Sequence, residues 1–290
     1  MRAVGTWRFL WPVWLAVLCL WCSPLRAGDA ETGAEAQRPL QFGLLPYVST
    51  RKLFTYYLPI KEYLERTLGR KVVMSTAPDF KTYLARARAG EYDLYHTAPH
   101  FAALAERDWG YRRVSRLNRE LDGSFVVAKN GKVQRIEDLR GGVVRVPDPL
   151  AIVTMLGEHT LREHGLKPGV DVNVRFSPSH NNAVLAVARG EADAAVTSAA
   201  VFEKMAPEVR EKLRVLASTQ KVPHMMFMAG PGLSDAEYRA LRGAMLAFTA
   251  AGEGREFFQE TGYGDMVDIS DTTMDTLAPF LDELAKRSQE

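Results

Sequence analysis

The chain has 290 residues, enough for one large domain or two smaller ones. Its 37 lysines and arginines nearly balance 35 aspartates and glutamates, so there is no electrostatic case for nucleic-acid binding. Hydrophobic residues make up 47%, which is a normal share for a globular protein.

The first 30 residues have the layout of a secretory signal peptide. Arg2 and Arg8 belong to a basic start, an uncharged apolar run covers residues 9–22, and small residues continue to Ala30. The apolar run is short for a membrane-spanning helix. We expect residues 1–27 to be a cleaved signal peptide that directs the protein to the periplasm, and an uncleaved membrane anchor is the alternative.

Both cysteines of the chain, Cys19 and Cys22, lie inside this segment. Removal of the signal peptide therefore removes every thiol, which excludes disulfides, thiolate nucleophiles and thiolate metal ligands in the exported protein. Residues 1–27 also carry three arginines and no acidic residue, so their loss changes the formal net charge from +2 to −1 (2 − 3).

Residues 28–38 are small and polar and predict a disordered leader. From Pro39 onward, short apolar runs typical of strands alternate with segments whose apolar residues recur at helical spacing, and a helical segment closes the chain. The expected strands cover residues 40–46, 71–77, 92–98, 113–118, 123–130, 143–148, 173–179, 193–199, 214–220 and 224–230, and the expected helices 54–69, 79–91, 100–109, 136–142, 151–165, 181–192, 201–213 and 234–250.

This alternation, with short connections, predicts parallel sheets that helices cover on both sides. One unit occurs twice. The sequence A-R-A-G-E-Y-D-L at 87–94 recurs as A-V-A-R-G-E-A-D-A-A at 186–195. In each copy a helix ends at glycine, an acidic residue follows, and aspartate opens a strand. The repetition indicates two similar α/β lobes.

Five stretches, in order, resemble segments of one family of exported receptors. They are FGLLPYVSTRKL (42–53), AGEYDLYHTAP (89–99), IEDLRGGVVRVPDP (136–149), SPSHNNAVLAVARGEADAA (177–195) and VPHMMFMAGPGLS (222–234). From about Leu40 to Lys286 the chain is similar to type II periplasmic solute-binding proteins, and most of all to the phosphonate- and phosphite-binding receptors of ABC transporters.

The resemblance implies two α/β lobes with central sheets, joined by two crossing strands, with a small solute held in the cleft between them. Lobe one would comprise residues 39–130 plus 226–290, and lobe two residues 131–225. Such receptors close by a hinge motion when ligand bridges the lobes. A monomer that delivers its ligand to an ABC permease and needs no cofactor is the expected function.

One stretch departs from the resembled pattern. In the phosphonate-binding branch, the helix after Asp-Pro opens with hydroxyl side chains that hold the oxyanion, but here those positions are Ala151, Ile152 and Val153. Asp148 could itself cap this helix, with Pro149 in its first turn. Phosphonate specificity is therefore not expected, and the ligand is predicted to be a different small organic molecule. Ile152 either faces that ligand or is buried against its neighbours.

The remaining candidate residues come from strand ends and helix starts. His96 and His100 have the spacing of a metal-binding pair on a helix, but Pro99 between them indicates that His96 ends a strand and His100 begins a helix. His96 is then expected to point into the cleft, where the family has an aromatic residue. The full set of predicted ligand contacts is Tyr47, Ser49, Thr50, His96, Thr97, Ile152, His180, Asn181, Thr197, Ser198 and His224.

Three other functions compete with transport. An enzyme is not expected, because the chain has no G-x-S-x-G, H-E-x-x-H, Walker or G-x-G-x-x-G motif in a suitable context. A metal receptor could use His96, His100, His180 and His224, since imidazole suits zinc, copper or nickel. A sensor that presents its ligand to a membrane histidine kinase would have the same fold, and the sequence does not separate it from a transport receptor.

Overall fold

The computed structural model describes residues 38–289, so the predicted signal peptide, its cleavage sites and most of the predicted leader lie outside the described residues. The last leader residue, Arg38, donates hydrogen bonds of 2.7 and 2.6 Å to the Asp93 carboxylate. The helices and strands are β1 Leu40–Leu44, α1 Thr50–Leu68, β2 Val72–Ser75, α2 Phe80–Arg88, β3 Leu94–Thr97, α3 Pro99–Trp109, β4 Arg112–Leu117, β5 Glu120–Leu121, β6 Gly123–Ala128, η1 Ile136–Leu139, β7 Val143–Val146, α4 Ile152–Glu163, β8 Asn173–Phe176, α5 His180–Ala188, β9 Ala194–Ser198, α6 Ala199–Glu203, α7 Pro207–Arg210, β10 Leu213–Ser218, β11 Val222–Pro223, β12 Met226–Ala229, α8 Asp235–Ala247, η2 Phe248–Ala250, α9 Gly252–Thr261, β13 Met266–Val267, α10 Asp271–Asp275 and α11 Ala278–Arg287.

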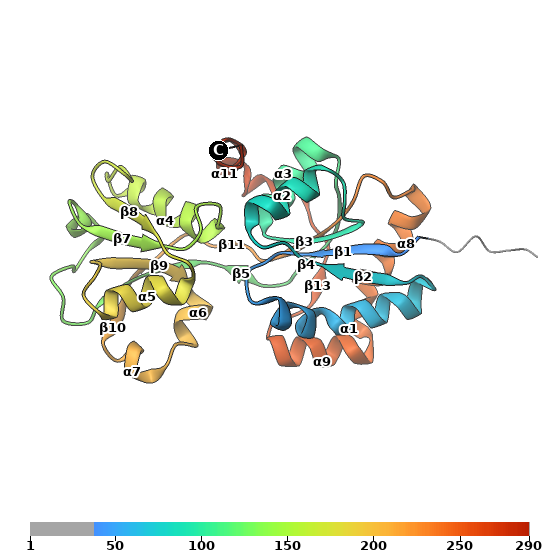
Figure 1. Cartoon of the computed structure of the whole chain (residues 1–290), viewed down its shortest axis with the longest axis horizontal. Coiled ribbons are helices and arrows are strands. Elements are labelled where there is room, and N and C mark those ends of the chain that lie inside the picture. Colours follow the sequence, from blue (N-terminus) through green and yellow to red (C-terminus); the bar gives the residue numbers. More distant parts are fainter. Residues whose placement is uncertain (1–37, 290) are drawn as a thin grey trace, which may run out of the picture. The chain divides into compact units, whose positions relative to one another are not determined.

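Two sheets define the two lobes that the sequence predicted. The sheet of the first lobe has the order β13-β4-β12-β3-β1-β2, and that of the second has the order β10-β6-β9-β7-β8. In the first lobe α1 and α9 lie on one face of the sheet, and α2 and α3 lie on the other (Figure 1). In the second lobe α4 and α5 cover opposite faces (Figure 1). The α/β fold class is therefore confirmed.

The sheets are mixed, whereas the alternation of strands and helices predicted parallel ones. In each lobe three strands are parallel, β2-β1-β3 and β8-β7-β9. The third of these parallel strands also pairs with an antiparallel strand. In the first lobe β3 pairs with β12, and in the second lobe β9 pairs with β6. Each added strand directly follows a crossing strand, since β5 and β11 pair antiparallel between the lobes.

The position of β6 changes the expected lobe boundary. Residues 39–130 were expected in the first lobe, but β6 hydrogen-bonds to β9 and β10 in the sheet of the second. The physical reason is that β5 has already crossed from the first lobe to the second, so the apolar strand β6 that follows it joins the sheet of the second lobe. After β11, the strand β12 joins the sheet of the first lobe.

The repeated unit seen in the sequence has the same geometry in both lobes. Gly90 and Gly190 have φ angles of +72° and +74°, which favour glycine where the helix ends. The Asp93 carboxylate accepts the Gln41 N–H at 2.8 Å, and the Asp193 carboxylate accepts the Val143 N–H at the same distance. Each aspartate thus ties the start of its strand to the neighbouring parallel strand, β1 in the first lobe and β7 in the second.

Two helices differ most from their expected bounds. The helix expected from residue 54 begins at Thr50, and Gly69 ends it with a φ of +60°, as predicted. The helix expected over 201–213 is instead two short ones, α6 and α7, because Pro207 lacks the N–H needed inside a helix and begins a new one.

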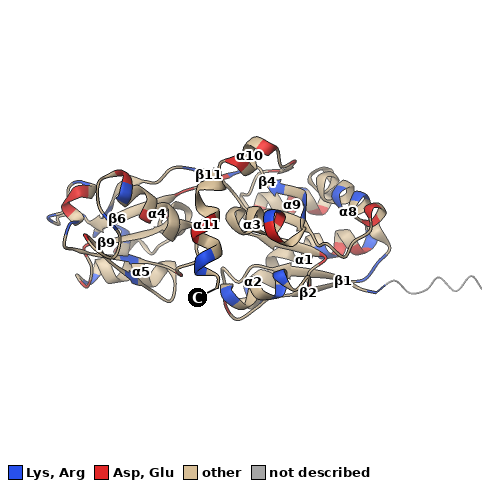
Figure 2. Cartoon of the chain, turned by 90° about the horizontal axis from the view of Figure 1, so that it is seen from above, with Lys and Arg blue, Asp and Glu red and all other residues tan. Residues whose placement is uncertain are grey.

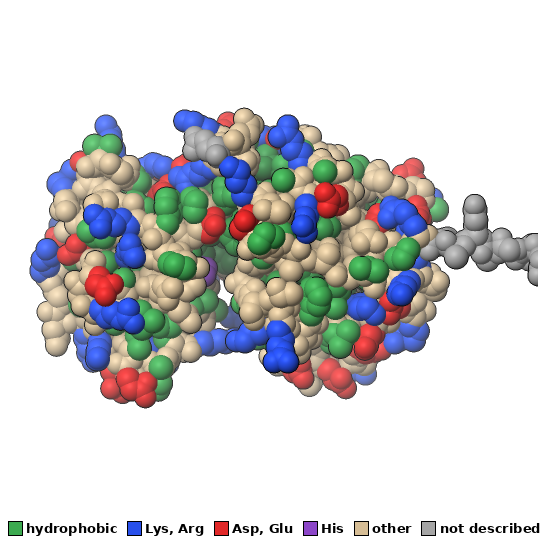
Figure 3. Space-filling view, viewed as in Figure 1, with side chains coloured by type: hydrophobic (Ala, Val, Ile, Leu, Met, Phe, Trp, Pro, Cys, Tyr) green, Lys and Arg blue, Asp and Glu red, His purple; other side chains and the backbone are tan. Residues whose placement is uncertain are grey.

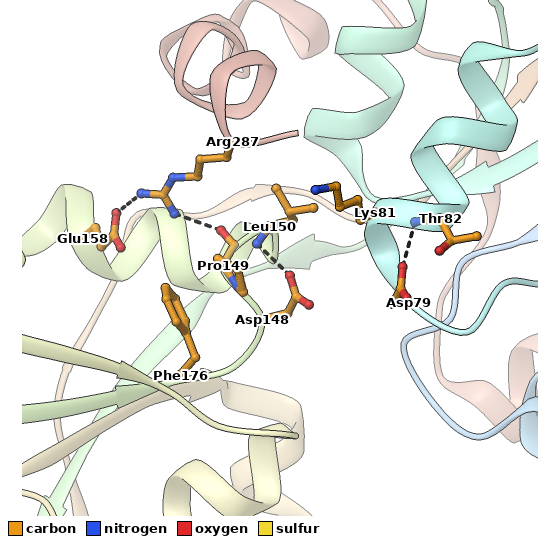
Figure 4. Close-up of a pocket in the computed structure, with 9 residues that line it drawn as sticks. All are labelled: Asp79, Lys81, Thr82, Asp148, Pro149, Leu150, Glu158, Phe176 and Arg287. Atoms are coloured by element: carbon orange, nitrogen blue, oxygen red, sulfur yellow. Dashed lines mark hydrogen bonds and ion pairs between the residues drawn. The ribbon is translucent and has the colours of Figure 1, made fainter. Parts of the chain in front are cut away.

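The C-terminal helix α11 contacts both lobes. It lies between α3 and α4 in Figure 2. The rings of Phe280 on α11 and His159 on α4 have centroids 6.1 Å apart. Arg287 donates to the carbonyl oxygen of Pro149 at 2.8 Å and to the carboxylate of buried Glu158 (Figure 4). These contacts hold α4 beside the first lobe.

Within residues 38–289, no helix combines the length and the apolar character that a bilayer crossing requires.

Candidate functional site

A cavity of about 460 Å³ lies between the lobes, at the ends of strands and the starts of helices. Figure 3 shows a hollow between the lobes, with a histidine side chain visible inside it. Residues of both lobes and of the crossing segments line the cavity. They are Leu45, Tyr47, Val48, Lys52, Tyr56, Phe80, Ala98, His100, Arg119, Leu121, Ala151, Ile152, Val153, His180, Asn181, Ser198, Ala200, Val201, Glu203, Lys204, His224, Met225, Thr261 and Tyr263.

Three of the longer helices, α1, α3 and α4, have their first turn at this cavity. In the part of the chain that the structure describes, no side chain caps the N-terminus of any of the three. Two further helices, α2 and α5, also begin at the cavity with Phe80 and His180, but the side chains of Asp79 and Ser179 cap them. Uncapped N–H groups and the positive ends of helix dipoles favour a negatively charged group.

The charged side chains at the cavity favour the same sign. Lys52, Arg119 and Lys204 are cationic, and Glu203 is the one acidic residue among the described lining residues. Arg119 is held in place by a 2.8 Å hydrogen bond to the carbonyl oxygen of Gly262. The lining therefore carries a net positive charge.

The start of α4 differs from the expected cap. Ala151, not Asp148, is the N-cap residue, and Pro149 precedes the helix. The Asp148 carboxylate instead accepts the Leu150 N–H at 2.7 Å, so it closes the turn before the helix. Burial raises the pKa of Asp148. Among the described residues, no carboxylate thus occupies the first turn of α4, where one was expected to exclude an anion.

His180 contacts two other predicted residues, Thr197 and Ser198, and lines the cavity together with Ser198. Its Nδ1 accepts the Ser198 N–H at 3.3 Å and lies 3.2 Å from the Thr197 hydroxyl. Because Nδ1 accepts a hydrogen bond, the ring proton of neutral His180 is on Nε2. Burial lowers the pKa of His180 to about 4, so the ring is neutral at pH 7. Asn181, in the next position of α5, also lines the cavity.

His96 does not lie where the sequence predicted it. It is fully buried and is not among the lining residues of the cavity. Its Nε2 lies 2.8 Å from the Tyr57 hydroxyl, and its ring packs against Tyr57 and Phe227 with centroid distances of 4.4 and 4.9 Å. The reason is that β3 runs on to Thr97 between two neighbouring strands, so His96 is part of the sheet and not of a loop.

The other predicted residues divide between the cavity and its surroundings. Tyr47, Ile152, Ser198 and His224 line the cavity. Thr97 and Thr197 are buried behind it. Ser49 and Thr50 are exposed at the start of α1 and lie outside the lining.

Sequence reasoning left out several lining residues, and two of them carried a signal. His100 follows Pro99 at the start of α3, and its Nε2 donates to the Leu150 carbonyl oxygen at 2.8 Å, from one lobe to the other. Tyr263 lies between Gly262 and Gly264, whose φ angles of +68° and +74° mark a tight turn that carries one aromatic side chain. Lys52 lies on α1 and Lys204 directly follows α6, and neither had such a signal.

The histidines at and near the cavity are the candidates for a metal site. Among residues 38–289, no group of three or more histidine, cysteine, aspartate or glutamate side chains is arranged to hold a metal ion. His100, His180 and His224 line the cavity, whereas His96, the fourth histidine considered, is buried outside it.

Comparison with solved structures places this fold among periplasmic binding proteins. PhnD1 from Prochlorococcus marinus, solved with methylphosphonate, has a TM-score of 0.74 and 15% identity over 85% of this chain and 98% of its own. XAC2383 from Xanthomonas citri, solved with ATP, has a TM-score of 0.73 and 16% identity over the same shares. A binding protein of an ABC phosphonate transporter from Pseudomonas aeruginosa has a TM-score of 0.70 and 18% identity over 86% of this chain and 89% of its own.

A family model matches most of the chain. Residues 42–274 fit the model described as the periplasmic substrate-binding protein of a phosphonate ABC transporter. The match covers well over half of the 290 residues and includes all five stretches that suggested the family. Members of this family bind a solute and do not act as enzymes. The chain belongs to the family of periplasmic substrate-binding proteins of phosphonate-type ABC transporters.

Proposed function

We propose that this protein captures a small organic acid, with a carboxylate at one end and an apolar body, and delivers it to an ABC permease. The observation that carries the proposal is the start of α4. Its first turn has no side-chain cap among the described residues, yet its side chains at the cavity are Ala151, Ile152 and Val153. It therefore offers backbone N–H groups to an anion, but no hydroxyl groups.

The missing hydroxyl groups matter more for a phosphonate than for a carboxylate. A phosphonate has three oxygens and up to two negative charges, so it needs more donors than a carboxylate with two oxygens and one charge. Each hydrogen bond to a charged group contributes about 1.5–3 kcal/mol, and several missing ones would weaken phosphonate binding strongly.

The rest of the lining agrees with an acid that has an apolar body. Leu45, Val48, Phe80 and Met225 provide apolar surface, and Lys52 adds a positive charge. A volume of about 460 Å³ is within the range of roughly 300–1,000 Å³ that small-molecule sites have. The cavity has room for an apolar chain in addition to the charged group.

Thermal unfolding with matched ligands tests this proposal. Butyrate and propylphosphonate have the same alkyl chain and differ in the charged group. We expect butyrate to raise the melting temperature more, since a ligand at about 100 times its Kd stabilises the folded state by about 2.7 kcal/mol. Greater stabilisation by propylphosphonate would contradict the proposal. Native mass spectrometry of the purified protein then identifies any ligand that remains bound.

A substitution that restores a hydroxyl group provides the complementary test. Ile152→Ser should increase affinity for propylphosphonate about tenfold, because the new hydroxyl can donate to the oxyanion. Val170→Ser is the matched control, since Val170 is 81% exposed and is not among the lining residues. Isothermal titration measures both, and unchanged phosphonate affinity in Ile152→Ser would argue against the role assigned to this turn.

A further inference from the structure

Three tyrosines and one histidine form a continuous chain of polar contacts beside the cavity. The hydroxyl oxygens of Tyr263 and Tyr47 are 3.3 Å apart, and those of Tyr47 and Tyr57 are 3.2 Å apart. The Tyr57 hydroxyl is 2.8 Å from His96 Nε2. Tyr47 and Tyr263 line the cavity, whereas Tyr57 and His96 are fully buried. The chain therefore connects the ligand site to a group that no ligand contacts.

His96 is held in one place and one charge state. Tyr57 packs on its ring at a centroid distance of 4.4 Å, and Phe227 packs at 4.9 Å. Burial, together with nearby His224, lowers the pKa of His96 to about 3, so the ring is neutral. A neutral imidazole has one N–H and one bare nitrogen. Its tautomer therefore decides whether Nε2 donates a hydrogen bond to the Tyr57 hydroxyl or accepts one from it.

The two tautomers would present different groups to the ligand. If Nε2 carries the proton, it donates to Tyr57, Tyr57 donates to Tyr47, and Tyr47 donates to Tyr263. The hydroxyl hydrogen of Tyr263 is then free for the cavity. If Nδ1 carries the proton, every bond in the chain reverses, and the chain ends in an oxygen that can only accept.

Two observations favour the first arrangement. The cavity carries a net positive charge and uncapped helix starts, so its ligand needs donors and not acceptors. Moreover, within the described part of the chain Nδ1 of His96 is buried without a hydrogen-bond partner. A buried N–H with no acceptor is rarer in folded proteins than an acceptor that lacks a donor, so a bare Nδ1 is the more favourable choice.

We propose that His96 is a positioning residue for ligand binding: as the Nε2–H tautomer, it directs the hydroxyl groups of Tyr57, Tyr47 and Tyr263 so that the chain ends in a donor at the cavity. The donor end rests on the proposed function, because it suits an anionic ligand. His96 contacts no ligand itself, and it selects ligand charge through the tyrosines.

The tautomer of His96 can be measured without a ligand. Long-range proton–nitrogen NMR spectra of the full chain labelled with ¹⁵N-histidine distinguish a protonated nitrogen from a bare one, and the signals that disappear in His96→Gln assign the residue. We expect Nε2 to be protonated and Nδ1 to be bare. A protonated Nδ1 would overturn the proposal whatever the ligand is.

Isosteric variants test the effect on binding. Tyr57→Phe keeps the ring packing but breaks the chain between His96 and Tyr47, and we expect it to reduce affinity for butyrate about fivefold. Tyr111→Phe is the control, because it removes a buried hydroxyl that donates elsewhere, to the Ala87 carbonyl oxygen. Equal butyrate affinity in Tyr57→Phe and the unmodified protein would contradict the positioning role. If butyrate binds neither protein while Nε2 is protonated, the ligand assignment fails and the tautomer assignment stands.

Discussion

The two lobes share a repeated unit but differ after the third of their parallel strands, which is β3 in the first lobe and β9 in the second. In the first lobe β3 leads into α3, an 11-residue helix with a continuous buried run from Pro99 to Ala105. In the second lobe β9 leads into α6, which has five residues and, among those described, none that is buried. Elements with few buried contacts open more easily. The first lobe therefore supplies a rigid wall of the cavity, and the second supplies the side that can adjust to a ligand.

Lowering the pH should have the largest effect on the free energy of unfolding, and it should act mainly through histidines of the first lobe and of the segments that cross between the lobes. Burial lowers the pKa of His96 to about 3 and those of His100, His180 and His224 to about 4. Unfolded histidines titrate near pH 6.5, so below that pH the unfolded chain binds protons that the folded chain does not. Stability present above pH 6.5 is lost toward pH 4, by about 1.4 kcal/mol per pH unit for each histidine.

Urea unfolding between about pH 7 and about pH 5 measures this loss. The slope of the unfolding free energy against pH gives the number of protons that the chain takes up on unfolding. His180→Gln should lower this number by one, and His96→Gln combined with His100→Gln should lower it by two. A stability that is constant over this range would show that these histidines titrate alike in the folded and unfolded chains.

The next largest effect concerns the link between the lobes. Arg287→Ala removes a partner of the buried Glu158 carboxylate and the donor to Pro149, and should cost about 3 kcal/mol. Arg242→Ala is the control, since Arg242 forms an exposed ion pair with Asp268, and such pairs contribute about 0–1 kcal/mol. Equal losses of unfolding free energy in the two variants would mean that α11 contributes no more than a surface contact.

The repeated aspartates allow a direct comparison of the lobes. Asp93→Ala should cost about 2 kcal/mol, because Asp93 is buried and pairs with Arg38 as well as with the Gln41 N–H. Asp193→Ala should cost about 1 kcal/mol, because Asp193 is more exposed and its other partner is Lys132 at 3.3 Å. Denaturant melts of both variants measure the difference, and a larger loss for Asp193→Ala would reverse the ranking.

The smallest effects should come from the caps of the paired helices α2 and α5. Asp79→Ala removes an acceptor that lies 2.7 Å from the Thr82 N–H, and Ser179→Ala removes one that lies 3.2 Å from the Asn182 N–H. We expect about 1 kcal/mol for the first and about 0.5 kcal/mol for the second, since the charged cap also interacts with the helix dipole. Thermal unfolding resolves losses of this size, and no loss in either variant would mean that these helix starts are held by packing alone.

Local signals in the sequence predicted most of the elements and the repeat. Gly69, Gly90 and Gly190 end helices as expected, because their positive φ angles are a local property. The partner of β6 could not be predicted, since a strand of apolar residues fits either sheet and the crossing decides which it reaches. The N-cap of α4 could not be predicted from helix propensity. It depends on the turn before the helix, in which the Leu150 N–H donates to the Asp148 carboxylate.

The candidate site was less predictable than the fold. Side-chain direction at a strand end depends on where the strand stops, and β3 stops one residue later than a cleft-facing His96 would need. The hydroxyl chain joins Tyr47 and Tyr57 to Tyr263, which is 216 residues from Tyr47 and meets it only through packing. Resemblance to a family pointed to the cleft, but it did not distinguish lining residues from those behind them.

The place of β12 has a consequence for the order of folding. The sheet of the second lobe uses strands from one continuous segment, β6 to β10, whereas β12 lies between β3 and β4 in the sheet of the first lobe. As the chain is made, the second lobe can complete its sheet first. Until residues 226–229 pair, the edges of β3 and β4 remain open and can pair with other chains. We therefore expect aggregation during refolding to begin in the first lobe, although it is the more rigid one once folded.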